Sequence, residues 1–400
     1  MQISDLATEQ KLLPLLRQAF RPMFLFGAAF SAIAMLLWGL ALAGHIKLNP
    51  FANVLFWHSH EMLFGFVCAI VIGFLLTAVQ NWTGLRAPHG YSLLIISVLW
   101  LSGRLLLLFG EGLPLALVAA VDLSFLPICA YLLARPLLQT GQSRNLFFVP
   151  VLLLLTACNA LMYLGVAYNR YDLIQLGSNN AVWLVTLLIA IVGGRVLPMF
   201  TANGTQTKKV EPIIWLDSAA LGSLWLIFVL HFFALTKYLP PLAMSSLFAA
   251  SALLTAMRCL RWKIWITLKV PLLWSLHLAY WCIPFGLTLF SARFAGFNIS
   301  NSIALHALTA GAMGGMILSM MARVSLGHSG RALKPHAIMS LAFLLVLAAA
   351  ISRTLLIWLW PAQTSQWLWL GVGGWVLAYL LYVLVYFPVL TTPRPDGRPG

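Results

Sequence analysis

Runs of about 20 apolar residues follow one another along almost the whole chain, and short polar connections separate them. An apolar run of this length crosses the hydrocarbon core of a bilayer as an α-helix. The pattern therefore predicts an all-α, polytopic membrane bundle of about twelve transmembrane helices in a single membrane domain, residues 1–400. The predicted helices are approximately 22–44, 54–80, 91–110, 114–134, 146–167, 179–200, 213–234, 238–259, 270–291, 302–324, 336–358 and 366–388.

Composition agrees with this interpretation. Hydrophobic residues make up 62% of the chain and charged residues 8%, and the mean hydropathy is +0.93. Soluble domains carry roughly 25% charged residues, so that class is excluded. The net charge of +15 could indicate a nucleic-acid partner, but the basic residues are spread over short loops instead of forming a patch. We therefore expect the lipid bilayer as a partner and no nucleic acid.

The distribution of Lys and Arg predicts how the chain is oriented. Most of the 24 basic residues lie at the N-terminus or in the loops after even-numbered helices. The opposite loops contain only Lys47, Arg170, Lys237 and Arg293. Because loops rich in Lys and Arg stay in the cytoplasm, we expect both termini there. Residues 1–20 show no signal-peptide pattern.

A faint internal repeat indicates a pseudo-threefold symmetry. Pro22, Pro150 and Pro271 each stand at the start of a span and are separated by four helices each time. Proline at a helix start is also common for general capping reasons, so that alternative stays open. The repeat predicts three pseudo-symmetric four-helix units with helices 2, 6 and 10 in inner positions. This arrangement resembles the catalytic subunit of haem-copper oxidases at the level of architecture.

The entry to the second span carries the chain's densest group of ionisable residues. His58, His60 and Glu61 stand at the mouth of a long apolar run, and ionisable groups within a spanning helix are functional candidates. Residues three apart share a helix face, whereas residues two apart do not. We therefore expect His58 and Glu61 to face one metal or haem centre and His60 to face another.

Two further histidines extend this candidate site. His306 enters the tenth span from the same side as His58 and His60 and at a similar depth, so these imidazoles could share a metal or a haem. His277 lies deeper, in the ninth span. The alternative is that each histidine is a hydrogen-bonded core residue. Imidazole binds iron, copper and zinc alike, so the residue type does not identify the metal.

The remaining charged residues within the spans have simpler explanations. Asp122 and Arg104 flank one short turn, so we expect them to form an ion pair. Glu61 has no obvious partner; it could orient an imidazole or donate a proton to a bound ligand. Arg195 and Arg323 lie at the inner ends of helices 6 and 10, where they could reach the interface or bind haem propionates.

Several motifs together resemble the NnrS family of bacterial membrane proteins, and the resemblance covers nearly the whole chain. They are WHSHEMLFG at 57–65, TAVQNWTG at 77–84, GGRVLPMFT at 193–201, LHALTAGAMG at 305–314 and RVSLGHSGR at 323–331. The resemblance implies an inner-membrane protein with haem b and copper and a role in the response to nitric oxide. It does not imply which histidine binds which metal.

Three hypotheses follow for the function. The first is a haem- and copper-binding protein that handles nitric oxide, by relieving nitrosative stress or by converting NO with electrons from an unidentified donor. The second is a metal-ion or proton-coupled transporter that uses the histidines and Glu61 as a transient site. The third is a haem-based NO sensor without turnover. The sequence leaves open whether the protein is an enzyme.

Overall fold

The computed structural model describes residues 10–398, and those residues form helices and connections without a strand. Twelve helices in this part of the chain are long and apolar enough to cross a membrane, which confirms the predicted all-α bundle. The chain is thus a multi-pass membrane protein. The spans are α2 (Phe20–Leu42), α3 to α4 (Val54–Thr83), α5 (Tyr91–Phe109), α6 (Leu115–Gln139), α7 to α8 (Ser143–Ala167), α9 (Tyr171–Thr205), α10 (Ile214–Phe232), α11 (Pro241–Arg261), α12 (Pro271–Phe294), α13 to α14 (Asn301–His328), α15 to α16 (Ile338–Leu359) and a last span, Pro361–Thr391, that contains α17 (Thr364–Thr391).

Local sequence signals set several helix ends. The side chains of Asn53 and Ser300 cap the second and tenth spans by accepting hydrogen bonds from the backbone N–H groups of Phe56 and Ile303. Gly84 ends the second span with a φ of 71°, a left-handed conformation that residues with a side chain rarely adopt. Caps of this kind satisfy backbone groups that the first and last helical turns leave without partners.

Three of the spans contain a π-helical segment, which is a rare conformation often associated with functional sites. In the second span, α3 (Val54–His60) is followed by η2 (Glu61–Val67) and then α4 (Cys68–Thr83). In the tenth span, α13 (Asn301–His306) is followed by η5 (Ala307–Gly314) and α14 (Gly315–His328). The eleventh span contains η6 (Ser352–Leu356). His60 and His306 therefore occupy matching positions, each as the last α-helical residue before a π-helical segment.

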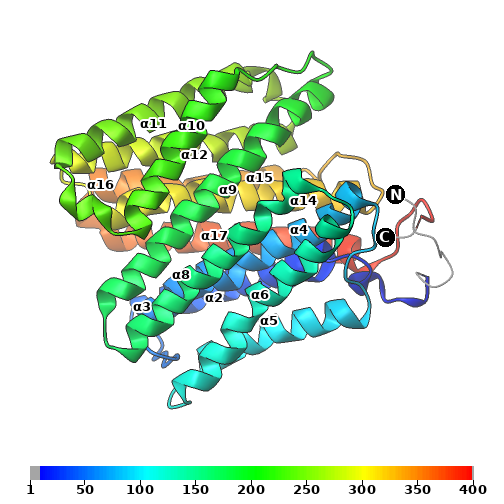
Figure 1. Cartoon of the computed structure of the whole chain (residues 1–400), viewed down its shortest axis with the longest axis horizontal. Helices are drawn as coiled ribbons and strands as arrows, with labels where there is room; N and C mark the ends of the chain where they lie inside the picture. The colour runs from blue at the N-terminus through cyan, green and yellow to red at the C-terminus, as the bar shows by residue number, and fades with distance from the viewer. Residues whose placement is uncertain (1–9, 399–400) are drawn as a thin grey trace. The chain divides into compact units, whose positions relative to one another are not determined.

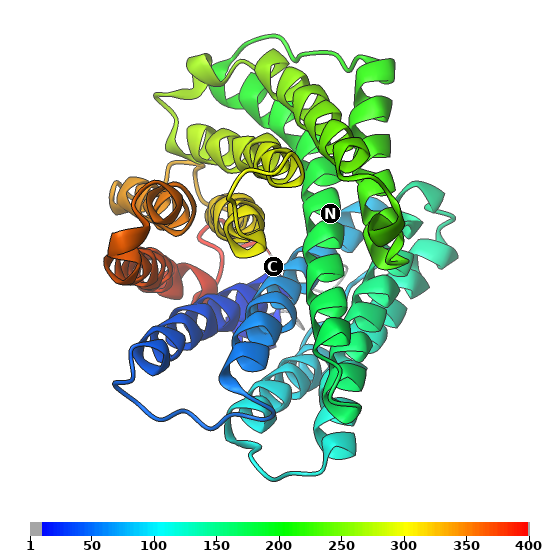
Figure 2. The ribbon, with the colours of Figure 1, turned by 90° about the vertical axis from the view of Figure 1, so that its left-hand side faces the viewer.

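The described chain forms two compact units. Unit 1 contains residues 10–181, 321–334 and 379–398, and unit 2 contains residues 182–320 and 335–378. Within unit 1, α2 lies beside α4 and α5 lies beside α6; within unit 2, α11 packs along α12 (Figures 1 and 2). The expected single domain and the three four-helix units stay predictions.

Burial distinguishes four spans from the rest. The most apolar window of the second and tenth spans is 78% buried, and that of the sixth and ninth spans is 67% buried. The other eight spans range from 28% to 44%. The three helices expected to be inner are thus among the most buried, and the ninth, which carries His277, joins them.

One end of unit 1 joins the start of the first span to the end of the last. Nη1 of Arg21 donates hydrogen bonds to the carbonyl oxygens of Leu390 and Thr392, both at 2.8 Å. Arg394 donates a hydrogen bond to the carbonyl oxygen of His328 at the end of the tenth span. The start of the first span and the ends of the tenth and last spans therefore lie together.

Candidate functional site

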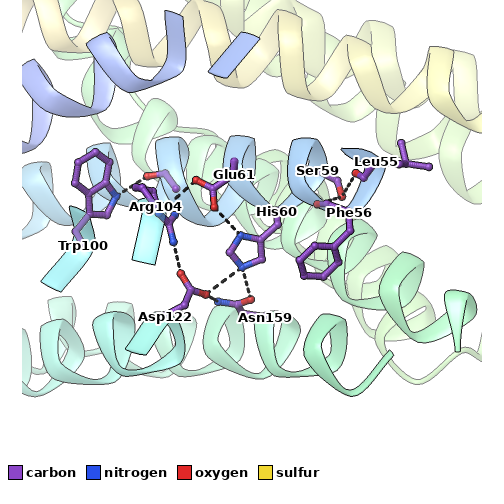
Figure 3. A network of polar contacts seen from close by, with 10 residues as sticks. Leu55, Phe56, Ser59, His60, Glu61, Trp100, Arg104, Asp122 and Asn159 are labelled. Atoms are coloured by element: carbon purple, nitrogen blue, oxygen red, sulfur yellow. Dashed lines mark hydrogen bonds and ion pairs between the residues drawn. The ribbon is translucent and has the colours of Figure 1, made fainter. Parts of the chain in front are cut away.

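A buried polar network surrounds His60 in unit 1 (Figure 3). The Nε2 atom of His60 lies 3.0 Å from Oδ2 of Asp122 and 2.8 Å from Oδ1 of Asn159. Nδ1 of the same ring lies 3.2 Å from Oε1 of Glu61. The Asn159 amide donates to Asp122 at 2.7 Å, so its oxygen faces the imidazole. Both ring nitrogens of His60 therefore have oxygen partners.

The positive charge of Arg104 completes this network. Arg104 forms an ion pair with Asp122, and its Nε lies 3.3 Å from Oε2 of Glu61. The side chains of these three residues are at most 4% exposed. Two carboxylates thus face one guanidinium and one imidazole inside the membrane-spanning part of the unit. Charges buried at this depth are stable only when they are paired and hydrogen-bonded.

The positions of the hydrogens in the network follow from its donors and acceptors. Because Nε2 of His60 faces two oxygen acceptors, this nitrogen carries a hydrogen. A further proton lies between Nδ1 and Glu61, on one atom or the other, because two acceptors would otherwise meet at 3.2 Å. His60 therefore presents no free lone pair in this arrangement, and its contacts favour a structural role over metal ligation. That His60 binds a metal stays a prediction.

The π-helical segment η2 shapes this site locally. It begins at Glu61, directly after His60, and neighbouring residues on a regular helix do not normally share a face. Gly65, one turn later, brings the backbone close to the network, and its carbonyl oxygen accepts a hydrogen bond from Trp100 (2.8 Å). A Cβ atom at Gly65 would lie 2.6 Å from Nη1 of Arg104, so a larger residue would displace the guanidinium.

The network agrees with some of the sequence expectations and differs from others. The ion pair between Asp122 and Arg104 is confirmed. Glu61 contacts His60 and Arg104, whereas the helical spacing predicted His58 as its neighbour. The His58 ring instead stacks on Trp38, with ring centroids 4.3 Å apart and planes 12° apart. The two histidines thus have different surroundings, and that they face separate metal or haem centres stays a prediction.

Asn159 was not predicted as a site residue from the sequence. It lies in α8 (Phe148–Ala167) and contacts both His60 and Asp122. A signal was present, because Asn159 is the only amide side chain in that apolar helix. An amide within a bilayer needs hydrogen-bond partners, and the nearest buried candidates were the ionisable groups already identified. Which helix would contact α8 could not be derived from its sequence.

His277 in unit 2 has a different environment. Its Nε2 lies 2.8 Å from the hydroxyl of Thr201, and its Nδ1 is buried without a hydrogen-bond partner. The residue is 1% exposed. A buried polar atom without a partner costs free energy, which a bound ligand, ion or water molecule can offset. His277 thus fits the role of a ligand to iron or copper.

His306, also in unit 2, is held by its own helix. Its Nδ1 donates to the carbonyl oxygen of Ser302 at 2.7 Å, which places the lone pair of the neutral ring on Nε2. Metal-binding histidines commonly have this second hydrogen bond, which fixes the tautomer and the ring orientation. Ser302 also accepts a hydrogen bond from Arg353 at 2.9 Å.

The contacts of α12 show how far apart these two histidines lie. A Cβ atom at Gly286 would touch Ala307 and Leu308, so Gly286 is level with the residues directly after His306. His277 precedes Gly286 by nine residues, which corresponds to about 13 Å along a helix. The two imidazoles are therefore too far apart along the helix to bind one metal ion, and they would serve separate centres.

The remaining predicted residues lie at the surface of their helices or partly buried. Arg195 is exposed on α9, and Arg323 is partly buried on α14. Their expected role in binding haem propionates stays a prediction. Within residues 10–398, no group of three His, Cys, Asp or Glu side chains is arranged to hold a metal ion. A haem needs only one or two axial ligands, so this finding leaves the haem prediction open.

Comparison with known proteins identifies the family. The family described as NnrS protein matches residues 14–394, which is nearly the whole chain. A search of curated proteins finds no match. The match includes every motif that suggested the resemblance, from the histidines of the second span to the motif at 323–331 at the end of the tenth. The chain therefore belongs to the NnrS protein family.

Proposed function

We propose that this protein binds haem b and copper in the bacterial inner membrane and handles nitric oxide, by relieving nitrosative stress or by converting NO. Membership of the NnrS family supports a role in the NO response. The twelve spans support residence in a membrane. The cluster of arginine contacts that joins the first, tenth and last spans supports cytoplasmic termini, because basic residues are retained on that side.

The observation that carries the cofactor proposal is the hydrogen bond from Nδ1 of His306 to Ser302. It fixes the tautomer in which Nε2 can bind iron or copper, and it lies at the junction of α13 with the π-helical segment η5. His60 precedes a π-helical segment in the same way, but its two nitrogens already have partners. We favour His306 as the ligand because its Nδ1 hydrogen bond places the lone pair of the neutral ring on Nε2.

His277 would serve a second centre through Nδ1, which has no hydrogen-bond partner among residues 10–398. His58 stays a candidate ligand beside Trp38. When bound, haem iron and copper supply NO binding and one-electron chemistry. The protein's own network contributes differently: Glu61 and Asp122 hold the His60 ring between them, and Arg104 balances their charge. Whether Glu61 also donates a proton to a bound ligand stays a prediction.

The proposal is tested by a visible spectrum and a metal analysis of detergent-purified protein from haem-replete cells. We expect a haem b spectrum in the reduced protein that changes when NO is added, together with bound copper. A protein without haem or copper would contradict the proposal. Transport of copper or protons into liposomes by such a colourless protein would support the transporter hypothesis.

An enzyme and a sensor are distinguished by turnover. If the reduced protein consumes NO repeatedly when an electron donor is supplied, it is an enzyme. If it binds one equivalent and stops, a sensor or a protective binder is the better description. Both results require a bound haem, so they refine the proposal without replacing it.

A further inference from the structure

Arg353, a partly buried arginine, differs from Arg104 and Arg258, which pair with carboxylates within the spans. It lies in the π-helical segment η6, and its Nη2 donates a hydrogen bond to the hydroxyl of Ser302 at 2.9 Å. Arg104 pairs with Asp122, and Arg258 pairs with Asp217. Among the described residues 10–398, Arg353 forms no ion pair with a carboxylate. It is thus a cation in a membrane span with a neutral partner.

The lack of a counter-charge has an energetic consequence. A charged side chain in a span is costly unless it is paired, and such residues commonly mark binding sites. The Ser302 hydroxyl satisfies one N–H group of Arg353 but supplies no negative charge. A guanidinium has five N–H donors in a planar fork that matches an oxyanion. Arg353 therefore keeps the capacity to bind an anion with two parallel hydrogen bonds.

The surroundings of Arg353 connect it to His306. The Ser302 hydroxyl lies 2.9 Å from Nη2 of Arg353 and 3.4 Å from Nδ1 of His306, so one serine contacts both cation and imidazole. Arg353 and His306 are both partly exposed, which leaves them accessible to a ligand. The segments η5 and η6 also contact each other, so two π-helical segments meet here. Arg353 lies in the π-helical segment η6, whereas Ser302 and His306 belong to α13, which ends where η5 begins.

We propose that Arg353 binds an oxyanion group beside His306, with Ser302 holding the guanidinium in place. The ligand chemistry is a negatively charged oxygen group that accepts two N–H bonds. Its source is either the phosphate of an anionic lipid headgroup or a small free oxyanion such as nitrite. The site needs neither haem nor copper, so it stands independently of the proposed function.

The test measures the melting temperature of delipidated, detergent-purified protein. One series contains sodium nitrite, nitrate or phosphate against sodium chloride at equal ionic strength. The other contains phosphatidylglycerol against phosphatidylcholine in mixed micelles. The variants are Arg353→Gln and Arg353→Lys, and the control is Arg170→Gln. Arg170 is an exposed arginine that pairs with the exposed Asp172.

We expect the wild type and the Arg170→Gln variant to show saturable stabilisation in at least one series. Arg353→Gln should raise the half-saturating concentration about tenfold or more, because the variant loses charge-assisted hydrogen bonds to the anion. Arg353→Lys keeps the charge and loses the planar fork, so its half-saturating concentration should lie between those of the wild type and Arg353→Gln. It also provides a folded variant if the glutamine variant fails to fold.

The two series identify the source of the oxyanion. An Arg353-dependent effect of the free anions indicates a small oxyanion, and one that appears only with phosphatidylglycerol indicates a lipid headgroup. Either result supports the proposed site. The proposal is overturned if neither series stabilises the wild type, or if Arg353→Lys and Arg353→Gln respond like the wild type.

Discussion

Nε2 of His60 lies 3.0 Å from Oδ2 of Asp122, although 62 residues separate them in the chain. This contact links the entry of the second span to α6, and Asn159 and Arg104 extend the link to α8 and α5. Four spans of unit 1 are therefore joined by charged and amide side chains that are almost fully buried. Removing one charge of this network should therefore destabilise unit 1.

Asp122→Asn keeps the size of the side chain and removes its charge. Arg104 would retain only Glu61 at 3.3 Å, and His60 would lose a carboxylate partner. Breaking a buried ion pair by removing one partner costs roughly 3–5 kcal/mol. We expect a loss of that size in the free energy of unfolding, measured by denaturant titration in mixed micelles.

The matched control for this variant is Asp172→Asn. Asp172 also pairs with an arginine, Arg170, through both carboxylate oxygens, but both side chains are about 60% exposed. Exposed pairs contribute little to stability. Asp172→Asn should therefore leave the unfolding transition unchanged. Equal effects of the two variants would show that the buried network does not stabilise unit 1.

Gly65→Ala tests the close approach of the η2 backbone to the network. Its added methyl group would lie within 3 Å of Arg104 Nη1, Glu61 Oε2 and Phe30 Cε1. We expect a loss of roughly 1–3 kcal/mol from overpacking, measured as above. Gly222→Ala in α10 is the control, because nothing lies within 4 Å of its added methyl group. That change should be neutral or stabilise by up to about 1 kcal/mol. If Gly65→Ala leaves the free energy of unfolding unchanged, the site has room for the added methyl group.

Low pH should weaken the ion pair between Arg394 and Asp396, which follows the last span. The Arg394 guanidinium, which donates to both oxygens of Asp396, lowers the pKa of that carboxyl from its ordinary value of 3.8 to about 2. Because the folded pKa is the lower one, this pair stabilises the protein above about pH 4. Its contribution is lost as the pH falls from about 4 to about 2.

The Asp396→Asn variant isolates this contribution. The wild type should melt at a higher temperature than the variant at pH 5, and the difference should shrink as the pH falls from about 4 to about 2. Arg394 also holds the His328 carbonyl, so this end of the tenth span should become more accessible to hydrogen exchange in parallel. A difference between the two proteins that stays constant down to pH 2 would rule out this pair as the cause.

The spans could be predicted from sequence because twenty apolar residues leave few alternatives to a membrane helix. The prediction 22–44 corresponds to Phe20–Leu42, and 302–324 corresponds to Asn301–His328. The pairing of Asp122 with Arg104 was also predictable, because a short turn joins their helices and two opposite charges in a bilayer need each other.

The centre of the network could not be predicted in the same way. Helical periodicity assigned Glu61 to the face of His58, but a π-helical segment begins at Glu61 and changes that periodicity. Asn159 contacts His60 and Asp122 because α8 packs beside their helices, and the hydropathy pattern does not show which helices pack together. The π-helical segments after His60 and His306 have no distinct hydrophobic pattern, so their common position was visible only in the structure.

Binding of a metal cofactor by His306 is tested by the haem and copper content of His306→Ala. The control is His89→Ala, because His89 also bonds a backbone carbonyl through Nδ1 but lies in a loop outside the spans. Both variants are purified in parallel and compared with the wild type by the Soret absorbance and the copper content per protein. We predict that His306→Ala inserts into the membrane and loses a haem or its copper, while His89→Ala keeps both. Full haem and copper content in His306→Ala would exclude His306 as a ligand of either.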